Sequence, residues 1–129
     1  MGVRLALDTN AYSGIAQADA SIIDIVERAE SLNLPFIVVA ELRAGFSLGT
    51  KGTANERELV RFMALPDVTV LHSTDTTLHH YAQLYRQLRS QGTPVPSNNL
   101  WIAAIVVEHQ LTLCTRDSHF HRMPQLPLV

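Results

Sequence analysis

Eight consecutive apolar residues, at positions 100–107, are the feature that most restricts how this chain can fold. The run is far shorter than the ~20 residues needed to span a bilayer, and a helix that is apolar on every side must be surrounded by other elements. With 129 residues, 47% of them hydrophobic, the chain is long enough to provide that cover within one domain. We therefore predict a single domain over residues 1–129 with a buried helix near its centre.

Four short runs have the composition of buried strands, because β-branched and other apolar residues dominate them. Asn33-Leu34-Pro35 separates the second run from the helical pattern before it, so we expect that strand to begin at Phe36. The four runs are Val3–Leu7, residues 36–39, Val68–Leu71 and residues 111–115, and a fifth run begins at residue 128.

Helical patterns separate the strand-like runs. Asp19 and Ser21 offer N-cap oxygens to one amphipathic helix, and good helix formers run from Ala40. Asn55 and Glu58 have the spacing of a capping box, in which the two residues cap the first turn of a helix. Strands that alternate with helices in this way predict an α/β sandwich of three layers, with a mainly parallel central sheet of four to five strands flanked by helices.

A longer helix is expected after Ser73 or Thr74, and Gly92 is suited to end it. Apolar residues at helical spacing should form the face that packs on the core: Leu78, Tyr81, Ala82, Tyr85 and Leu88. For Tyr81, Tyr85 and Trp101 we favour packing in the core over a platform on which nucleic-acid bases stack.

Acidic residues follow three of the expected strands. Asp8 comes directly after the first, Glu41 lies in the expected first turn of the helix after the second, and Asp117 follows the fourth. The carboxyl ends of parallel strands meet at one edge of the sheet, where such folds bind their ligands. Asn99, at the expected start of the central helix, can join the three acids there.

Carboxylates gathered at ~4 Å repel one another by roughly 4 kcal/mol per pair at an effective dielectric constant near 20, so cations or protons must offset the cost. Oxygen ligands favour Mg²⁺ or Mn²⁺ over zinc, and with a phosphodiester substrate such a site supports hydrolysis. Taken singly, Asp8 also fits a turn or cap, Glu41 a partner of the helix dipole and Asp117 a cap. Their shared position favours the metal site.

Other polar residues allow two interpretations each. His119 and His121 more often belong to a surface turn than to a metal site, and Arg43 and Arg116 can hold either a phosphate or a neighbouring carboxylate. The net charge of −2 gives no polycationic signature, so any contact with nucleic acid must be local. The single cysteine, Cys114, is expected to be buried and inert. A lone thiol and an amino terminus without a secretion signal fit a cytoplasmic protein.

Four segments in order resemble the motifs of PIN-domain ribonucleases, specifically the VapC-type toxins of type II toxin–antitoxin systems. They are Leu7-Asp8-Thr9-Asn10, Val39-Ala40-Glu41-Leu42-Arg43-x-Gly45, Pro96-x-Asn98-Asn99-Leu100-Trp101-Ile102-Ala103-Ala104 and Thr115-Arg116-Asp117-Ser118-His119-Phe120. The resemblance spans nearly the whole chain. It implies a PIN-like sandwich and an endoribonuclease that depends on Mg²⁺ or Mn²⁺. It also implies a homodimer, a small cognate antitoxin that occupies the active-site groove, and RNA substrates that include structured RNAs such as tRNA.

Carried over by position, the resemblance makes Asp8, Glu41 and Asp117 the acidic metal ligands and catalytic residues of this chain. Asn99 stands where the family normally has a further acid, an aspartate. An asparagine offers a carbonyl oxygen but lacks the charge that holds a hard cation. Asn99 is either an engineered replacement, which the intact motif around it favours, or a natural variant with weakened metal binding. The alternative is a non-catalytic module that binds RNA or an antitoxin.

Overall fold

A computed structural model describes residues 2–129 and contains one four-stranded sheet with the order β3-β2-β1-β4. All three strand pairs are parallel. The strands are β1 (Val3–Leu7), β2 (Ala29–Pro35), β3 (Val68–Leu71) and β4 (Thr112–Cys114). The expected fifth strand is reduced to a parallel bridge between Leu113 and Leu128. The predicted α/β class and parallel sheet are therefore confirmed.

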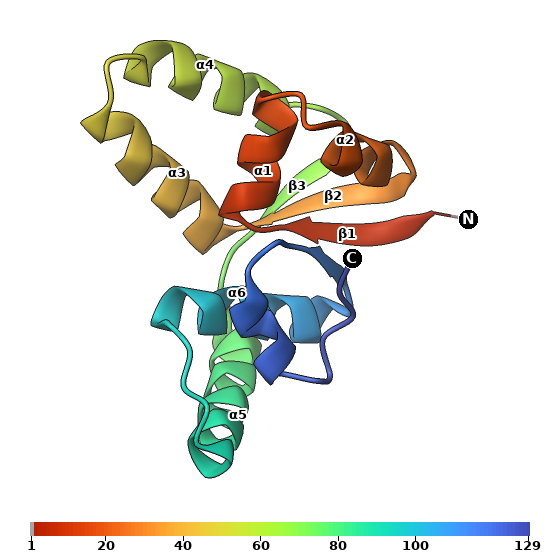
Figure 1. Ribbon diagram of the computed structural model, residues 1–129, viewed down its shortest axis with the longest axis vertical. Helices are drawn as coiled ribbons and strands as arrows, with labels where there is room; N and C mark the ends of the chain where they lie inside the picture. Colours follow the sequence, from red (N-terminus) through yellow and green to blue (C-terminus); the bar gives the residue numbers. More distant parts are fainter. Residues whose placement is uncertain (1) are drawn as a thin grey trace.

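Helices cover both faces of this sheet. Helices α1 and α2 lie on one side, whereas α5 and α6 lie on the other together with the short 3₁₀ helix η1 (Figure 1). Helices α3 and α4 pack against each other beside α1 (Figure 1). Their bounds are α1 (Thr9–Ala16), α2 (Ala20–Glu27), α3 (Phe36–Leu48), α4 (Gly52–Met63), α5 (Asp75–Gln91), α6 (Ser97–His109) and η1 (Ser118–Arg122).

The second strand is not where the sequence pattern predicts it. Residues 36–39 form the first turn of α3, and β2 instead begins at Ala29, soon after α2. The β-branched Val38 and Val39 are buried in the helix. Helix propensity disfavours such residues by less than ~1 kcal/mol each, whereas burying an aliphatic side chain stabilises by about 1.5–3 kcal/mol. Packing therefore overrides the local preference, and the helix starts directly after Pro35, the last residue of β2.

Helix α4 also begins earlier than predicted. Its first residue is Gly52, and Lys51 occupies the N-cap position without a side-chain hydrogen bond. Asn55 lies inside the helix, where its backbone N–H donates to the carbonyl of Lys51 at 2.9 Å. The capping box expected from Asn55 and Glu58 is therefore not formed, although the helix does form and buries Leu59.

Helix α5 begins and ends where predicted but presents a different face to the core. Thr74 is its N-cap and Gly92 ends it in the left-handed conformation, with φ of 70°. Glu108 of α6 accepts hydrogen bonds from the hydroxyls of Thr74, at 3.1 Å, and of buried Thr77. The face of α5 that carries Thr77 thus packs against α6, and the buried residues of the helix are Thr77, Leu84 and Leu88.

Three residues of the predicted α5 face are exposed instead. Leu78 and Tyr85 keep 49% and 50% of their surface accessible, and Ala82 is also exposed. Tyr81 and Trp101 are half-buried, and their ring centroids lie 4.5 Å apart. The prediction that these aromatic residues pack in the core is therefore wrong for Tyr85, half of whose surface is open to solvent.

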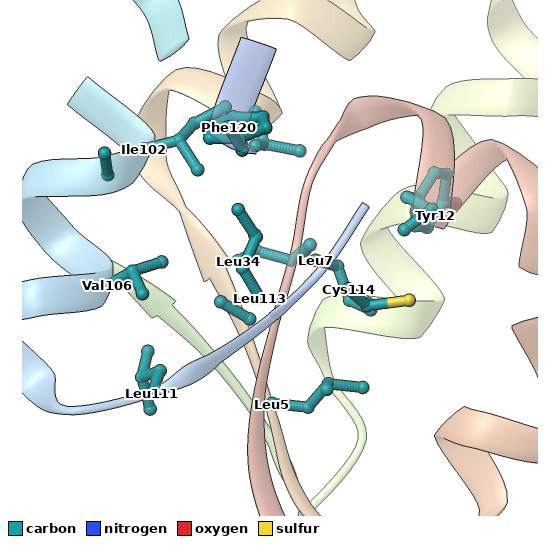
Figure 2. Close-up of a cluster of buried hydrophobic side chains, with 14 of the residues drawn as sticks. Leu5, Leu7, Tyr12, Leu34, Ile102, Val106, Leu111, Leu113, Cys114 and Phe120 are labelled. Atoms are coloured by element: carbon teal, nitrogen blue, oxygen red, sulfur yellow. The ribbon is translucent and has the colours of Figure 1, made fainter. Parts of the chain in front are cut away.

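The central helix is confirmed. In α6 the residues from Ile102 to Val106 are all buried. Ile102 and Val106 belong to the same core as the apolar residues of the strands (Figure 2). Cys114 is fully buried, and burial raises the pKa of its thiol, as expected of an inert cysteine. Within residues 2–129 no helix is both long and apolar enough to cross a membrane.

The different face of α5 leads to a paired test by substitution. Leu84→Ala should lower the free energy of unfolding by about 2–5 kcal/mol, because it leaves a cavity at a buried position. Leu78→Ala, on the same helix, should change it by only about 0.5 kcal/mol, because half of that side chain is already exposed. Urea unfolding followed by circular dichroism measures both. Equal losses from the two variants would contradict the observed orientation of α5.

Candidate active site

Asp8 lies at the carboxyl end of β1 and caps α1. Its Oδ1 accepts a hydrogen bond from the backbone N–H of Ala11 at 2.8 Å, and its Oδ2 accepts one from the Thr115 hydroxyl at 2.5 Å. Only 4% of the residue is exposed. Asp8 is thus both a helix cap and a buried carboxylate at the ligand-binding edge of the sheet, so the two interpretations of its sequence position are compatible.

Glu41 reaches the same edge from α3. It lies beyond the first turn of that helix, because α3 starts at Phe36 rather than near Ala40. Its Oε1 accepts from the Thr9 hydroxyl at 2.7 Å, and its Oε2 accepts from the side-chain amide of Asn98 at 3.1 Å. These two donors come from α1 and α6, so Glu41 ties three helices together at the edge of the sheet.

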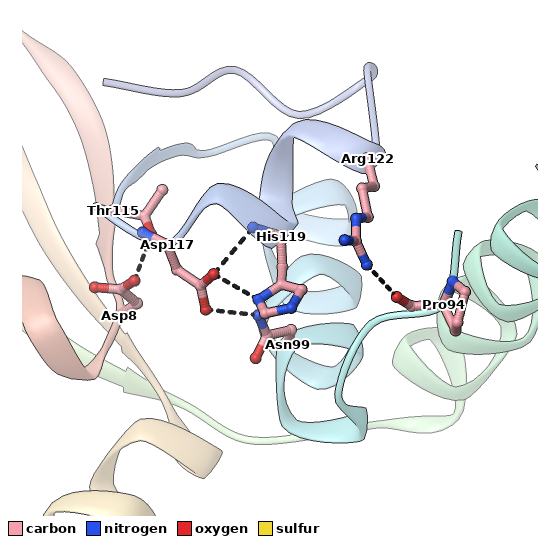
Figure 3. Close-up of polar contacts among 7 residues, drawn as sticks. All are labelled: Asp8, Pro94, Asn99, Thr115, Asp117, His119 and Arg122. Atoms are coloured by element: carbon pink, nitrogen blue, oxygen red, sulfur yellow. Dashed lines mark hydrogen bonds and ion pairs between the residues drawn. The ribbon is translucent and has the colours of Figure 1, made fainter. Parts of the chain in front are cut away.

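Asp117 follows β4 and caps η1. Its Oδ1 accepts from the backbone N–H of His119 at 2.9 Å and lies 2.7 Å from the Nδ1 atom of the same residue. Its Oδ2 accepts from the side-chain amide of Asn99 at 2.9 Å. Figure 3 shows Asp117 between Asp8 on one side and Asn99 with His119 on the other. Asn99 thus joins the acids, as its place at the start of α6 predicts.

The four predicted residues line one small pocket, which we call the acidic pocket. Its volume is about 180 Å³, and it contains no lysine or arginine side chain among the described residues. The lining residues are Asp8, Thr9, Asn10, Glu41, Asn99, Ile102, Asp117 and Phe120. The four residues meet because each comes from an element that begins or ends at one edge of the sheet.

Burial and hydrogen bonding shift the pKa values of Asp8 and Asp117 in opposite directions. Burial raises the pKa of Asp8, and the charges of Asp117 and Glu41 raise it further against the bonds from Thr115 and Ala11. Burial also acts to raise the pKa of Asp117, but the hydrogen bonds from His119 and Asn99 outweigh it and hold that pKa below its ordinary value. The negative charge is therefore less stable on Asp8 than on Asp117.

Two residues of the site escape the sequence patterns. Asn98 holds Glu41, although its only sequence signal is its position beside Asn99 in the motif. His119 contacts Asp117 while 39% of its side chain is exposed, so it lies in a surface turn and also supports the site. His121 is exposed on η1, as expected of a surface turn.

The two arginines next to the acids in sequence lie outside the acidic pocket. Arg43 pairs with Glu56 of α4, with 2.6 Å between Nε and Oε1. Arg116 donates to the Ser21 hydroxyl of α2 at 3.2 Å. Of the two open interpretations, the carboxylate partner is correct for Arg43, and Arg116 turns away from the site toward α2.

Comparison with known proteins identifies the family. Residues 5–126, almost the entire chain, match the family model described as PIN domain. The chain belongs to the PIN-domain family. Plasmid stability protein StbB of Pseudomonas syringae is 34% identical over 88% of this chain and 88% of its own length. Ribonuclease VapC4 of Mycobacterium tuberculosis is 28% identical over 100% of this chain and 98% of its own.

Solved structures place this PIN domain among the VapC-type proteins. VapBC2 from Rickettsia felis, bound to a promoter DNA fragment, matches with a TM-score of 0.85 and 26% identity over 97% of this chain and 96% of the matched chain. VapBC-5 from Mycobacterium tuberculosis, described as a member of the VapBC family of toxin-antitoxin systems, matches with a TM-score of 0.74 and 26% identity over 96% and 94%. The predicted family is confirmed.

The acidic pocket of this PIN domain fits a hydrated divalent cation. Within residues 2–129 no three His, Cys, Asp or Glu side chains lie close enough to bind one ion directly. Mg²⁺, however, keeps several of its waters and is commonly held by one or two carboxylates. The oxygen-rich pocket without basic side chains is compatible with that mode of binding.

The raised pKa of Asp8 leads to a pH-dependent prediction for the PIN domain in EDTA. Asp8→Asn should raise the midpoint of thermal unfolding at pH 7, because a carboxyl group whose pKa is raised in the folded state destabilises the fold once it ionises. The gain should vanish below the ordinary pKa of 3.8, where Asp8 is protonated in both states, and should grow as the pH rises toward the folded-state pKa.

Differential scanning calorimetry from pH 3 to pH 8 measures this gain. Asp67→Asn is the matched control, because Asp67 is exposed and lies outside the acidic pocket, and it should have little effect at any pH. An Asp8→Asn variant that is less stable than the unmodified chain at pH 7 would show that the ionised Asp8 does not destabilise the fold.

Proposed function

We propose that this PIN domain is a VapC-type toxin that hydrolyses RNA phosphodiester bonds with Mg²⁺ or Mn²⁺, in a form weakened or inactivated by Asn99. The observation that carries the proposal is the meeting of Asp8, Glu41 and Asp117 around one acidic pocket, with Asn99 at the position of the family's further aspartate. The relative VapC4 is itself named a ribonuclease, which supports the same chemistry here.

Asp8 and Asp117 are the proposed direct or water-mediated holders of the cation, with Glu41 beside them. When bound, the ion would activate water for attack on the phosphorus and stabilise the leaving oxygen. The protein's part is to fix the carboxylates in advance. Thr115 holds Asp8, and His119 holds Asp117, so neither carboxylate has to be immobilised when RNA binds.

Asn99 is the proposed reason for weak activity. Its amide donates to Asp117 at 2.9 Å and so compensates part of that negative charge without any ion. An aspartate at this position would remove the donor and add a charge, and both changes favour a cation between residues 99 and 117. The asparagine therefore stabilises the metal-free pocket and opposes metal binding.

The proposed partners follow the resemblance and the structural relatives. A cognate antitoxin is expected, because the chain is similar to proteins of VapBC complexes. RNA is the proposed substrate, with structured RNA such as tRNA among the candidates, and a cytoplasmic homodimer is the proposed working form.

The second candidate function is a module that binds RNA or antitoxin without cutting, and the Asn99 hydrogen bond that satisfies Asp117 without a metal favours it.

Restoring an aspartate at position 99 distinguishes the proposed nuclease from the proposed binding module. Asn99→Asp should increase Mg²⁺-dependent cleavage of total RNA on the order of 100-fold or more, because metal ligands and their supports each contribute about 10–100-fold. Cleavage should disappear in EDTA and in the double variant Asn99→Asp, Asp117→Asn. Gel analysis of total RNA, followed by mapping of the cleaved ends, measures this and identifies the target.

Asn55→Asp is the matched control, since it makes the same chemical change on α4, outside the acidic pocket. It should leave cleavage at the level of the unmodified chain. A folded Asn99→Asp protein that cuts no RNA with Mg²⁺ would refute the proposed nuclease and leave the binding module. Full cleavage by the unmodified chain would refute both the weakening role of Asn99 and the binding module.

A further inference from the structure

Charge is divided unequally along this chain. Residues 1–75, which include β1–β3 and helices α1–α4, contain ten acidic and six basic residues. Residues 76–129, which include nearly all of α5 together with α6, β4 and η1, contain two acidic residues and four arginines, with five of the six histidines. Helices α5 and α6 lie on the side of the sheet opposite α1 and α2 (Figure 1), so the side that they cover carries few acidic residues.

The carboxylates of residues 76–129 are both engaged inside the fold. Glu108 accepts the hydroxyls of Thr74 and Thr77, and its side chain is 11% exposed, whereas Asp117 belongs to the acidic pocket. The exposed arginines at the end of α5 and on η1 therefore have no carboxylate partner among the described residues. They are Arg86, Arg89 and Arg122. The net charge of −2 is a sum over the whole chain and does not indicate this local positive surface.

An apolar cavity lies beside these arginines, and we call it the α5 cavity. Its volume is about 210 Å³, and its walls include Tyr85, Leu88, Pro94, Val95 and Leu100, with Arg89 also lining it. Tyr85, half of whose surface is exposed, is thus among the residues that line this cavity. An aromatic ring next to an arginine is a common means by which proteins bind unpaired nucleic acid.

The α5 cavity and the acidic pocket are both lined by the first turns of α6. Leu100 lines the cavity, and Asn99, the residue before it, lines the pocket. A second connection runs through η1, which starts after Asp117 and ends at Arg122. The Arg122 guanidinium donates to the carbonyl of Pro94, a cavity residue, at 2.5 Å (Figure 3).

We propose that an unpaired nucleotide of the RNA substrate binds in the α5 cavity, with its base against Tyr85 and its phosphates on Arg89 and Arg122. The proposal rests on the proposed ribonuclease function and names the surface that holds its substrate. Arginine pairs with phosphate through its planar fork of donors, and stacking on an aromatic ring tolerates any base.

A polyanion complements this surface, because exposed arginines without a carboxylate partner among the described residues lie around the cavity. A base-paired helix cannot present a single base to such a small cavity, since its bases are stacked and paired. The proposal therefore predicts a preference for unpaired RNA over duplex.

Fluorescence anisotropy with the unmodified chain in EDTA tests binding without cleavage. The probes are a fluorescein-labelled RNA of about 12 nucleotides with mixed, unpaired sequence, within the usual footprint of single-strand binding, and the same strand annealed to its complement. The unpaired probe should bind more tightly.

Tyr85→Ser should weaken binding of the unpaired probe about 5- to 100-fold with little change in salt dependence, whereas Tyr85→Phe should bind like the unmodified chain. Arg89→Ser should weaken binding. It should also make the plot of log K against the logarithm of salt concentration less steep by about 0.7, because one phosphate contact is lost.

Arg57→Ser on α4 is the matched control, because it removes one exposed arginine from the acidic half of the chain. It should leave binding unchanged. The proposal is overturned if Arg57→Ser weakens binding as much as Arg89→Ser, if duplex binds as tightly as unpaired RNA, or if Tyr85→Ser has no effect. It is also overturned if Tyr85→Ser converts a dimer to a monomer in sedimentation while RNA binding is kept.

The two proposals fail in distinguishable ways. RNA binding that depends on Tyr85 and Arg89, without cleavage by the Asn99→Asp variant, would refute the nuclease and retain the RNA surface. Cleavage by that variant, with binding independent of both residues, would retain the nuclease and refute the surface. No binding of either probe to the unmodified chain would refute the surface outright.

Discussion

The buried carboxylate of Asp8 is the constraint to which the rest of the site is fitted. Parallel pairing of β1 with β2 and β4 brings Asp8, α3 and Asp117 to one edge of the sheet. Each carboxylate there is held by donors from other elements, such as Thr115 for Asp8 and Thr9 for Glu41. These hydrogen bonds limit the repulsion but do not remove it, because burial and the neighbouring acids still raise the pKa of Asp8. A divalent cation is the proposed ligand of this pocket.

Much of this arrangement can be predicted from the sequence, because it depends on the order of elements more than on their precise bounds. The second strand illustrates this. Its predicted position at residues 36–39 is wrong, yet Glu41 still arrives at the correct edge, since both alternatives end a strand and begin a helix next to it. Local propensity could not identify β2 within residues 29–35, where Glu30, Ser31 and Asn33 interrupt the apolar pattern. This segment forms a strand by parallel pairing with β1, a contact between segments that are distant in the sequence.

What the sequence could not supply is the set of contacts between distant elements. Thr74 and Thr77 bond to Glu108 of α6 while Tyr85 stays half-exposed, and nothing within α5 itself indicates that orientation of the helix. Asn98 likewise acquires its role only when α6 meets α3. These are the contacts that give the acidic pocket its support and leave an aromatic residue free beside an arginine-rich surface. The proposed function of this PIN domain therefore depends on how α5 and α6 pack on the sheet.

Calorimetric titration with Mn²⁺ tests the central claim most directly, because that claim concerns charge at the acidic pocket rather than turnover. The account predicts weak binding to the unmodified chain, much tighter binding to the Asn99→Asp variant, and loss of that gain when Asp117→Asn is added. It also predicts that Asn99→Asp is less thermally stable than the unmodified chain in EDTA and that Mn²⁺ reverses the difference. Equal Mn²⁺ affinity of the unmodified chain and the Asn99→Asp variant would contradict it.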